Sequence, residues 1–77
     1  MPSPRRPYGE TAHRRAIGSR IAELRRERGW RQLELASRAD LHRPYVTGIE
    51  TGPQRDGTRV RIANALGVPL IEFFRTD

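Results

Sequence analysis

The sequence contains no cysteine, so neither a disulfide bond nor a thiolate metal site can hold the fold together. Its two histidines, His13 and His42, lie far apart and lack the ligand spacing that a metal site requires. No apolar run approaches the roughly 20 residues of a membrane span, and no signal-peptide segment is visible. We therefore expect a soluble, cytoplasmic protein that needs no metal ion and no other cofactor.

Basic residues outnumber acidic ones by 15 to 9, and every basic residue is an arginine. The formal net charge is +6 and the pI is about 11.4. This excess favours a polyanionic partner, because neutralising phosphates releases their counterions. An anionic membrane surface would attract the same charge, but the sequence lacks the amphipathic face rich in Trp and Phe that such binding uses.

With 77 residues, of which 35% are hydrophobic, the chain has enough apolar material for one small domain with a thin core. Residues 1–10, "MPSPRRPYGE", hold three prolines and a glycine and show no helical period. They predict a flexible basic arm, followed by a folded domain over residues 11–77. Two interpretations of the arm stay open: a frayed terminus, or a basic tail that lies along DNA.

Apolar residues at helical spacing predict five short helices and no strand, and hence an all-α fold. The first is expected to start with Thr11 as its N-cap and to end at Gly29. The second covers residues 32–39, "QLELASRA", with Arg31 where a capping Ser or Thr would be expected. The fourth covers about residues 58–66 and ends at Gly67; its apolar residues are Val60, Ile62, Ala63 and Leu66. The fifth begins at Pro69 and carries Phe73 and Phe74.

The third helix, about residues 42–51, contains two poor helix formers, Pro44 and Gly48. Pro44 falls in the first turn, where a missing N–H breaks no intrahelical bond. Val46 and Ile49 form the buried stripe, and Gly52-Pro53 ends the helix. Asp40 precedes it in a tight turn, where Asp tolerates the left-handed conformation better than most residues.

The spacing of Gln32, Ala36, Asp40, Val46 and Ile49 fits two helices joined at a steep angle by a short turn. The pattern "IGSRIAELRRERGWRQLELASRADLHRPYVTGIETG…RIANALGVPLIEFF" resembles the phage-repressor family (Cro and repressor-like, also called XRE) over roughly residues 16–74. Within it, "LHRPYVTGIE" is similar to the branch that contains the controller proteins of restriction–modification systems. The resemblance implies a compact five-helix repressor-like helix-turn-helix domain that binds double-stranded DNA.

With Val46 and Ile49 buried, the outward face of the third helix centres on Pro44, Thr47, Gly48 and Thr51, with Arg43 and Tyr45 beside it. The resemblance implies that this helix enters the major groove and that Arg43, Pro44 and Gly48 meet base edges. Two explanations of Pro44 and Gly48 stay open. Either they clear the face for close approach of DNA, or they are drift in a helix whose fold is set by packing.

Arg43 is the main candidate for reading a base, because its guanidinium can bridge O6 and N7 of a guanine. Thr47 can offer a hydroxyl or a methyl group, and Tyr45 either reaches DNA or packs against the second helix. His42 is expected to cap the third helix or contact a phosphate. The resemblance implies that Gln32 grips a phosphate at a helix N-terminus, and Arg31 and Arg55 are further phosphate candidates.

The resemblance also implies a partly buried ion pair between Arg25 and Glu50, and a homodimer on a palindromic operator. One of Phe73 and Phe74 should complete the core, while the other is a candidate dimer contact. No nucleophile with a placed base is visible, so we expect no catalysis. The sequence thus predicts a DNA-binding transcriptional regulator; the alternative is a protein-interaction module, such as an antitoxin or adaptor, that reuses the fold.

Overall fold

The computed structural model describes the backbone of residues 5–74 and the side chains from residue 15 to residue 74. Its elements are α1 (Arg5–Glu27), α2 (Gln32–Ala39), α3 (Arg43–Thr51), α4 (Asp56–Leu66) and the 3-10 helix η1 (Leu70–Phe74). No strand occurs over residues 5–74, so the all-α prediction is confirmed. The expected fifth helix is a single 3-10 turn, and the element count is therefore four α-helices plus that turn.

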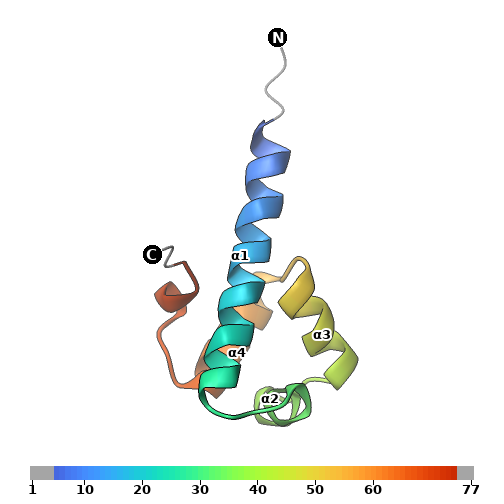
Figure 1. The fold of residues 1–77 in the computed structure, drawn as a ribbon, viewed down its shortest axis with the longest axis vertical. Helices are drawn as coiled ribbons and strands as arrows, with labels where there is room; N and C mark the ends of the chain where they lie inside the picture. The colour runs from blue at the N-terminus through green and yellow to red at the C-terminus, as the bar shows by residue number, and fades with distance from the viewer. Residues whose placement is uncertain (1–4, 75–77) are drawn as a thin grey trace.

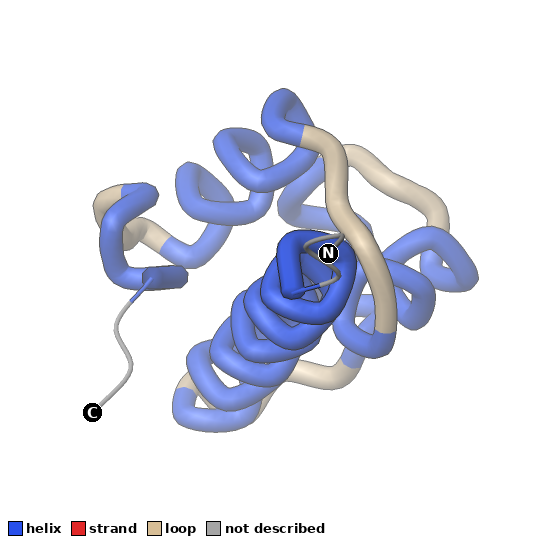
Figure 2. The backbone as a smooth tube through the Cα atoms, turned by 90° about the horizontal axis from the view of Figure 1, so that it is seen from above, coloured by secondary structure: helices blue, strands red, loops and turns tan. Residues whose placement is uncertain are grey.

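The long α1 forms the axis of the molecule, and its first turns extend beyond the other helices (Figure 1). In this view α3 and η1 lie on opposite sides of α1, with α4 behind it. From above, the remaining helices form an arc around α1 (Figure 2). This arrangement leaves α2 and α3 together at one side of the molecule.

The start of α1 differs from the prediction. The helix begins at Arg5, six residues before Thr11, which lies inside α1 and is not its N-cap. Pro7 is the third residue of α1, where a missing backbone N–H breaks no intrahelical bond, so the proline does not prevent the helix. Residues 1–4 of the expected arm lie outside the described residues, and both the domain boundary and the arm's role stay predictions.

The turns follow their local chemistry. Asp40 adopts the left-handed conformation with φ 59° and ψ 49°, as predicted, and Gly29 and Gly67 take φ 72° and 73° at the ends of α1 and α4. Arg31 is the N-cap of α2 and makes no side-chain capping bond, also as predicted. α4 begins at Asp56, two residues before the expected start, because an acidic residue in the first turn favours the helix dipole.

The core joins all five elements. Its largest fully buried side chains are those of Ile17, Ile21, Leu35, Val46, Ile62 and Phe73. Phe73 is therefore the core phenylalanine, and Phe74 is 37% exposed. Val60, an apolar residue of the fourth helix, is 46% exposed and contributes nothing to the core.

Gly18 sets the distance between α1 and α3. A Cβ atom at this position would lie 2.7 Å from the backbone oxygens of both Ile49 and Glu50, closer than real contacts allow. Only glycine lets the end of α3 rest directly on α1. The same end of α3 is held by the buried amide of Gln54, whose Nε2 donates to the carbonyl oxygens of Ile49 (2.9 Å) and Gly52 (2.6 Å).

A polar contact holds η1 against α1. Arg20 donates from Nη2 to Glu72 Oε1 over 3.1 Å and from Nε to the Glu72 carbonyl oxygen over 3.3 Å. Hydrogen bonds to Glu23 and Glu72 raise the pKa of the Arg20 guanidinium. Arginine is charged at every physiological pH, and its two bonds to Glu72 hold η1 against α1.

Candidate nucleic-acid interface

The predicted DNA-contact residues gather at the starts of three helices and along α3. Arg31, His42 and Arg55 are the N-cap residues of α2, α3 and α4. None of the three side chains makes a capping hydrogen bond. His42 thus occupies the expected cap position without capping through its side chain, and the alternative, a phosphate contact, stays a prediction. Amide groups at a helix start carry partial positive charge and favour anions. The starts of α2 and α4 each contact α3, through Gln32–Thr47 and Tyr45–Thr58, so these two helix starts and their basic N-cap residues border the same helix.

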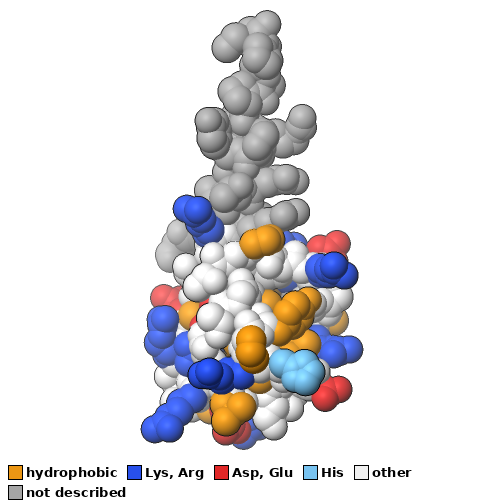
Figure 3. Space-filling model, turned by 90° about the vertical axis from the view of Figure 1, so that its right-hand side faces the viewer, with side chains coloured by type: hydrophobic (Ala, Val, Ile, Leu, Met, Phe, Trp, Pro, Cys, Tyr) orange, Lys and Arg blue, Asp and Glu red, His pale blue; other side chains and the backbone are white. Residues whose placement is uncertain are grey.

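The arginines divide into paired and unpaired groups. Those outside this region include Arg25, Arg28 and Arg59, whose guanidinium groups donate to carboxylates, amides or backbone carbonyls. The guanidinium groups of three candidate residues form no hydrogen bond or ion pair with any described residue: these are Arg31, Arg43 and Arg55. The same is true of Arg15 and Arg26 on α1, so the lack of a partner is not confined to the candidate residues. Figure 3 shows this side of the molecule, with arginine side chains around a middle that is largely uncharged.

The exposed face of α3 has the composition expected from the sequence. Val46 and Ile49 are buried at 0% and 2% exposure. Five residues on the other face are exposed: Pro44, Tyr45, Thr47, Gly48 and Thr51. A Cβ atom at Gly48 would meet nothing within 4 Å. The fold therefore gives no steric reason for a glycine at this position.

A chain of hydrogen bonds connects α1, α2 and α3. Arg25 donates from Nε to Glu50 Oε2 over 2.6 Å and from Nη2 to Oε1 over 3.1 Å, which confirms the ion pair. Gln32 Nε2 donates to the same Glu50 Oε1 over 3.0 Å. Thr47 Oγ1 in turn donates to Gln32 Oε1 over 2.8 Å. The amide of Gln32 is thus oriented by one residue on each side, and its second N–H remains available at the start of α2.

Tyr45 contacts α4. Its hydroxyl oxygen lies 3.4 Å from Thr58 Oγ1, a contact that neither interpretation of the sequence anticipated. Between the starts of α3 and α4 lies an open hollow of about 430 Å³, lined by Leu41, Tyr45, Arg55, Gly57, Thr58 and Arg61. The sequence did not identify Arg61, whose Nη1 donates to the backbone oxygen of Asp40 over 3.3 Å. Two arginines and two hydroxyl groups therefore surround this hollow.

Comparison with known proteins assigns the fold to a family. The family model described as "Helix-turn-helix" matches residues 21–73, which span α2, the turn and α3. The chain belongs to the XRE-type helix-turn-helix family. It is 36% identical over 61 residues to the uncharacterized HTH-type transcriptional regulator y4dJ of Sinorhizobium fredii, covering 77% of this chain and 79% of that protein. The resemblance seen in the sequence is confirmed.

Two solved structures share the helix-turn-helix fold of this chain. The restriction–modification controller protein C.AhdI from Aeromonas hydrophila is 34% identical with a TM-score of 0.72, covering 77% of this chain and 92% of that one. The hypothetical transcription factor NHTF from Neisseria is 28% identical with a TM-score of 0.74, covering 80% of this chain and 74% of that one. These similarities support a DNA-binding regulator.

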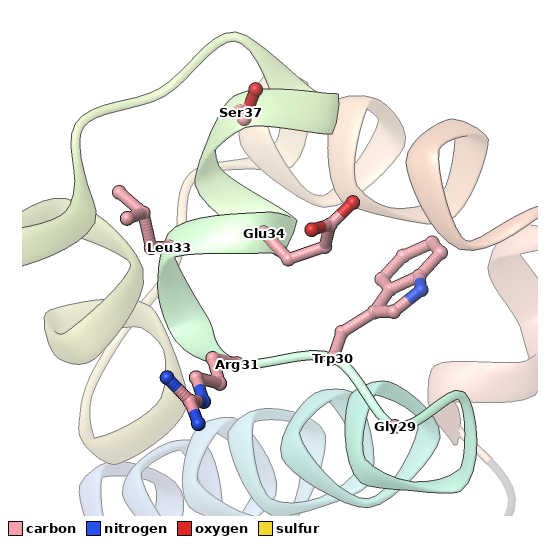
Figure 4. A pocket seen from close by; sticks show the side chains of 6 residues that line it. All are labelled: Gly29, Trp30, Arg31, Leu33, Glu34 and Ser37. Carbon is pink, nitrogen blue, oxygen red and sulfur yellow. The ribbon is translucent and has the colours of Figure 1, made fainter.

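A second hollow of this helix-turn-helix chain, of about 460 Å³, lies beside α2 and is lined by Gly29, Trp30, Arg31, Leu33, Glu34 and Ser37. In Figure 4 Trp30 and Glu34 reach toward one another, while Leu33 extends from the other side of α2. Arg38 stacks on the Trp30 ring at 4.3 Å and pairs with Glu34 at 2.7 Å. These contacts hold α2 on the turn that follows α1. Packing therefore accounts for the positions of Trp30, Glu34 and Arg38.

Within the part of the chain that the structure describes, no helix is long and apolar enough to cross a membrane. In the same part, no group of three or more His, Asp or Glu side chains is placed to hold a metal ion.

Proposed function

We propose that this protein is a sequence-specific regulator that binds double-stranded DNA as a homodimer, with α3 in the major groove of a palindromic operator. The observation that carries the proposal is the exposed face of α3 between two uncapped helix starts that bear unpaired arginines. Such a surface combines a helix of suitable width for the groove with cationic groups for the phosphates on each side. The likeness to a restriction–modification controller supports the same function.

Each residue has a distinct role in this proposal. Arg43, at the start of α3, reads a guanine through O6 and N7. Gln32 and Arg31 bind a phosphate at the start of α2, where the amide is already oriented by Glu50. Other phosphate contacts come from His42 at the start of α3 and from the hollow that holds Arg55 and Tyr45.

The dimer is proposed to form through η1. This short element exposes three apolar side chains, Leu70 at 38%, Ile71 at 69% and Phe74 at 37%. A cluster of exposed apolar residues on so small a domain is typical of an association surface. Twofold association would place two copies of α3 on half-sites about 34–36 Å apart, one turn of DNA.

Salt dependence tests the DNA-binding function against the protein-interaction alternative. Each phosphate neutralised contributes a slope of about −0.9 to the plot of log K against log salt concentration. A dimer that neutralises four phosphates with Arg31 and Arg55 should give a slope of about −4. Arg55→Ala should flatten the slope, whereas Arg38→Ala, which removes an arginine already paired with Glu34, should change it less. Affinity for duplex DNA that does not respond to salt would contradict the proposal.

Sedimentation tests the dimer separately. Ile71→Glu should shift the protein to monomers at concentrations where the parent is dimeric, because the charge would be buried between copies. Leu33→Glu is the matched control, since Leu33 is 65% exposed but lies on α2. If Ile71→Glu leaves the dimer intact, η1 is not the interface.

A further inference from the structure

The centre of the exposed α3 face offers no free side-chain hydrogen-bond donor. Pro44 and Gly48 have no side-chain donor at all. The single hydroxyl proton of Thr47 goes to Gln32 Oε1 at 2.8 Å, with the Arg43 carbonyl oxygen as a second internal acceptor at 3.3 Å. The Thr51 hydroxyl donates to the Thr47 carbonyl oxygen over 2.9 Å. All four residues are nevertheless exposed.

This composition limits what the centre of α3 can recognise. The major-groove edges of guanine, adenine and thymine present acceptors at N7, O6 and O4, and a face without free donors cannot bind these atoms by hydrogen bonds. The hydroxyl oxygens of Thr47 and Thr51 keep acceptor capacity for adenine N6 and cytosine N4, and Thr47→Val below removes that capacity at the central residue. The 5-methyl group of thymine is different, because it requires only an apolar surface at close range. The proline ring and the threonine methyl groups supply that apolar surface. Gly48, which has no side chain, leaves room for the thymine methyl group to approach it.

From this we infer that the centre of α3 selects 5-methylpyrimidines, with Thr47 as the specificity-determining residue and its methyl group as the contacting atom. The bond to Gln32 occupies the Thr47 hydroxyl and thereby fixes the rotamer that positions the methyl group. Hydrogen-bonded reading is left to Arg43 at the start of the helix. This inference rests on the proposed function, because it describes how the same DNA surface chooses its bases.

Uracil substitution tests the inference directly. Thymines in an operator selected by the protein are replaced one at a time by uracil, which keeps every hydrogen-bonding group and loses only the methyl. At one or two positions in each half-site, affinity should fall about fourfold, the ratio that corresponds to one buried methyl group. Uracils outside the half-sites are the control and should have no effect. If the intact operator binds and no uracil changes affinity, the inference is overturned while the proposed function stands.

Two substitutions of Thr47 separate its methyl group from its hydroxyl. Thr47→Val keeps a methyl in place and removes the hydroxyl, so the uracil penalty should persist. Thr47→Ser keeps the hydroxyl and removes the methyl group. At one position, the thymine and uracil operators should then bind with about equal affinity. Thermal unfolding of both variants checks that the domain is intact. A penalty that survives in the serine variant and disappears in the valine variant would assign the reading to the hydroxyl and overturn the inference.

Discussion

Arg25 and Glu50 form a two-bonded ion pair in the interior, with Nε to Oε2 at 2.6 Å and Nη2 to Oε1 at 3.1 Å. Both side chains are largely buried, at 10% and 5% exposure. The pair joins the end of α1 to the end of α3, and Arg25 also donates from Nη1 to the backbone oxygen of Trp30 over 2.7 Å. Because Glu50 also orients Gln32, the same carboxylate connects the packing of the domain to its proposed DNA surface.

Glu50→Gln should lower the free energy of unfolding by about 3–5 kcal/mol, because it leaves the buried Arg25 cation without a counter-charge. Urea denaturation would measure the loss. The control is Glu34→Gln, which breaks an ion pair with Arg38 that is about half exposed and should cost less than about 1 kcal/mol. Equal losses in the two variants would show that the interior pair has no special role.

Gly18→Ala should destabilise the domain by about 1–3 kcal/mol, since the new methyl group would collide with two backbone oxygens that cannot rotate away. The shift of the urea midpoint measures this effect. An unchanged midpoint would mean that α1 and α3 separate without cost, contrary to the close packing found between them.

Gly48→Ala should act in the opposite direction on stability. The position is helical and open, so alanine should stabilise the domain by about 0.5–1 kcal/mol. Operator affinity should nevertheless fall, because the methyl group fills the face that close approach requires. Asn64→Ala, on the exposed side of α4, is the control for helix propensity alone. If the Gly48→Ala protein binds its operator as tightly as the parent, the glycine at position 48 has no role in the close approach of DNA.

Arg43→Ala should relax the choice of base at one position in each half-site, since a guanine contact through O6 and N7 contributes about 1–3 kcal/mol of discrimination. Arg31→Ala should instead weaken binding to all sequences by a similar factor and reduce the salt slope by about 1 for each copy. Comparison of the sequences selected by the two variants distinguishes base reading from phosphate binding. An unchanged motif for Arg43→Ala would remove Arg43 from the reading role.

The features predicted correctly from sequence depend on local chemistry or on the family motif. The left-handed turn at Asp40, the ends at Gly29 and Gly67 and the buried stripe of α3 all follow from residue type and spacing. The Arg25–Glu50 pair followed from the resemblance, because its partners are 25 residues apart.

The features that sequence reasoning missed depend on tertiary placement. The bond of Thr47 to Gln32 crosses 15 residues, and that of Tyr45 to Thr58 crosses 13, so no local pattern indicates them. The close approach at Gly18 is likewise set by the position of α3. The starts of α1 and α4 were placed too late, because Pro7 and Gly57 are poor interior helix residues that the first turn tolerates.

Selection of bound sequences from a random pool of double-stranded DNA, near physiological salt, tests the central claim most directly. A sequence-specific dimer predicts a recovered palindrome whose half-sites lie about one helical turn apart, with a guanine in each half-site for Arg43. Recovery of unenriched sequences, with binding that vanishes as salt rises, would mean nonspecific attraction to phosphates and would contradict the account.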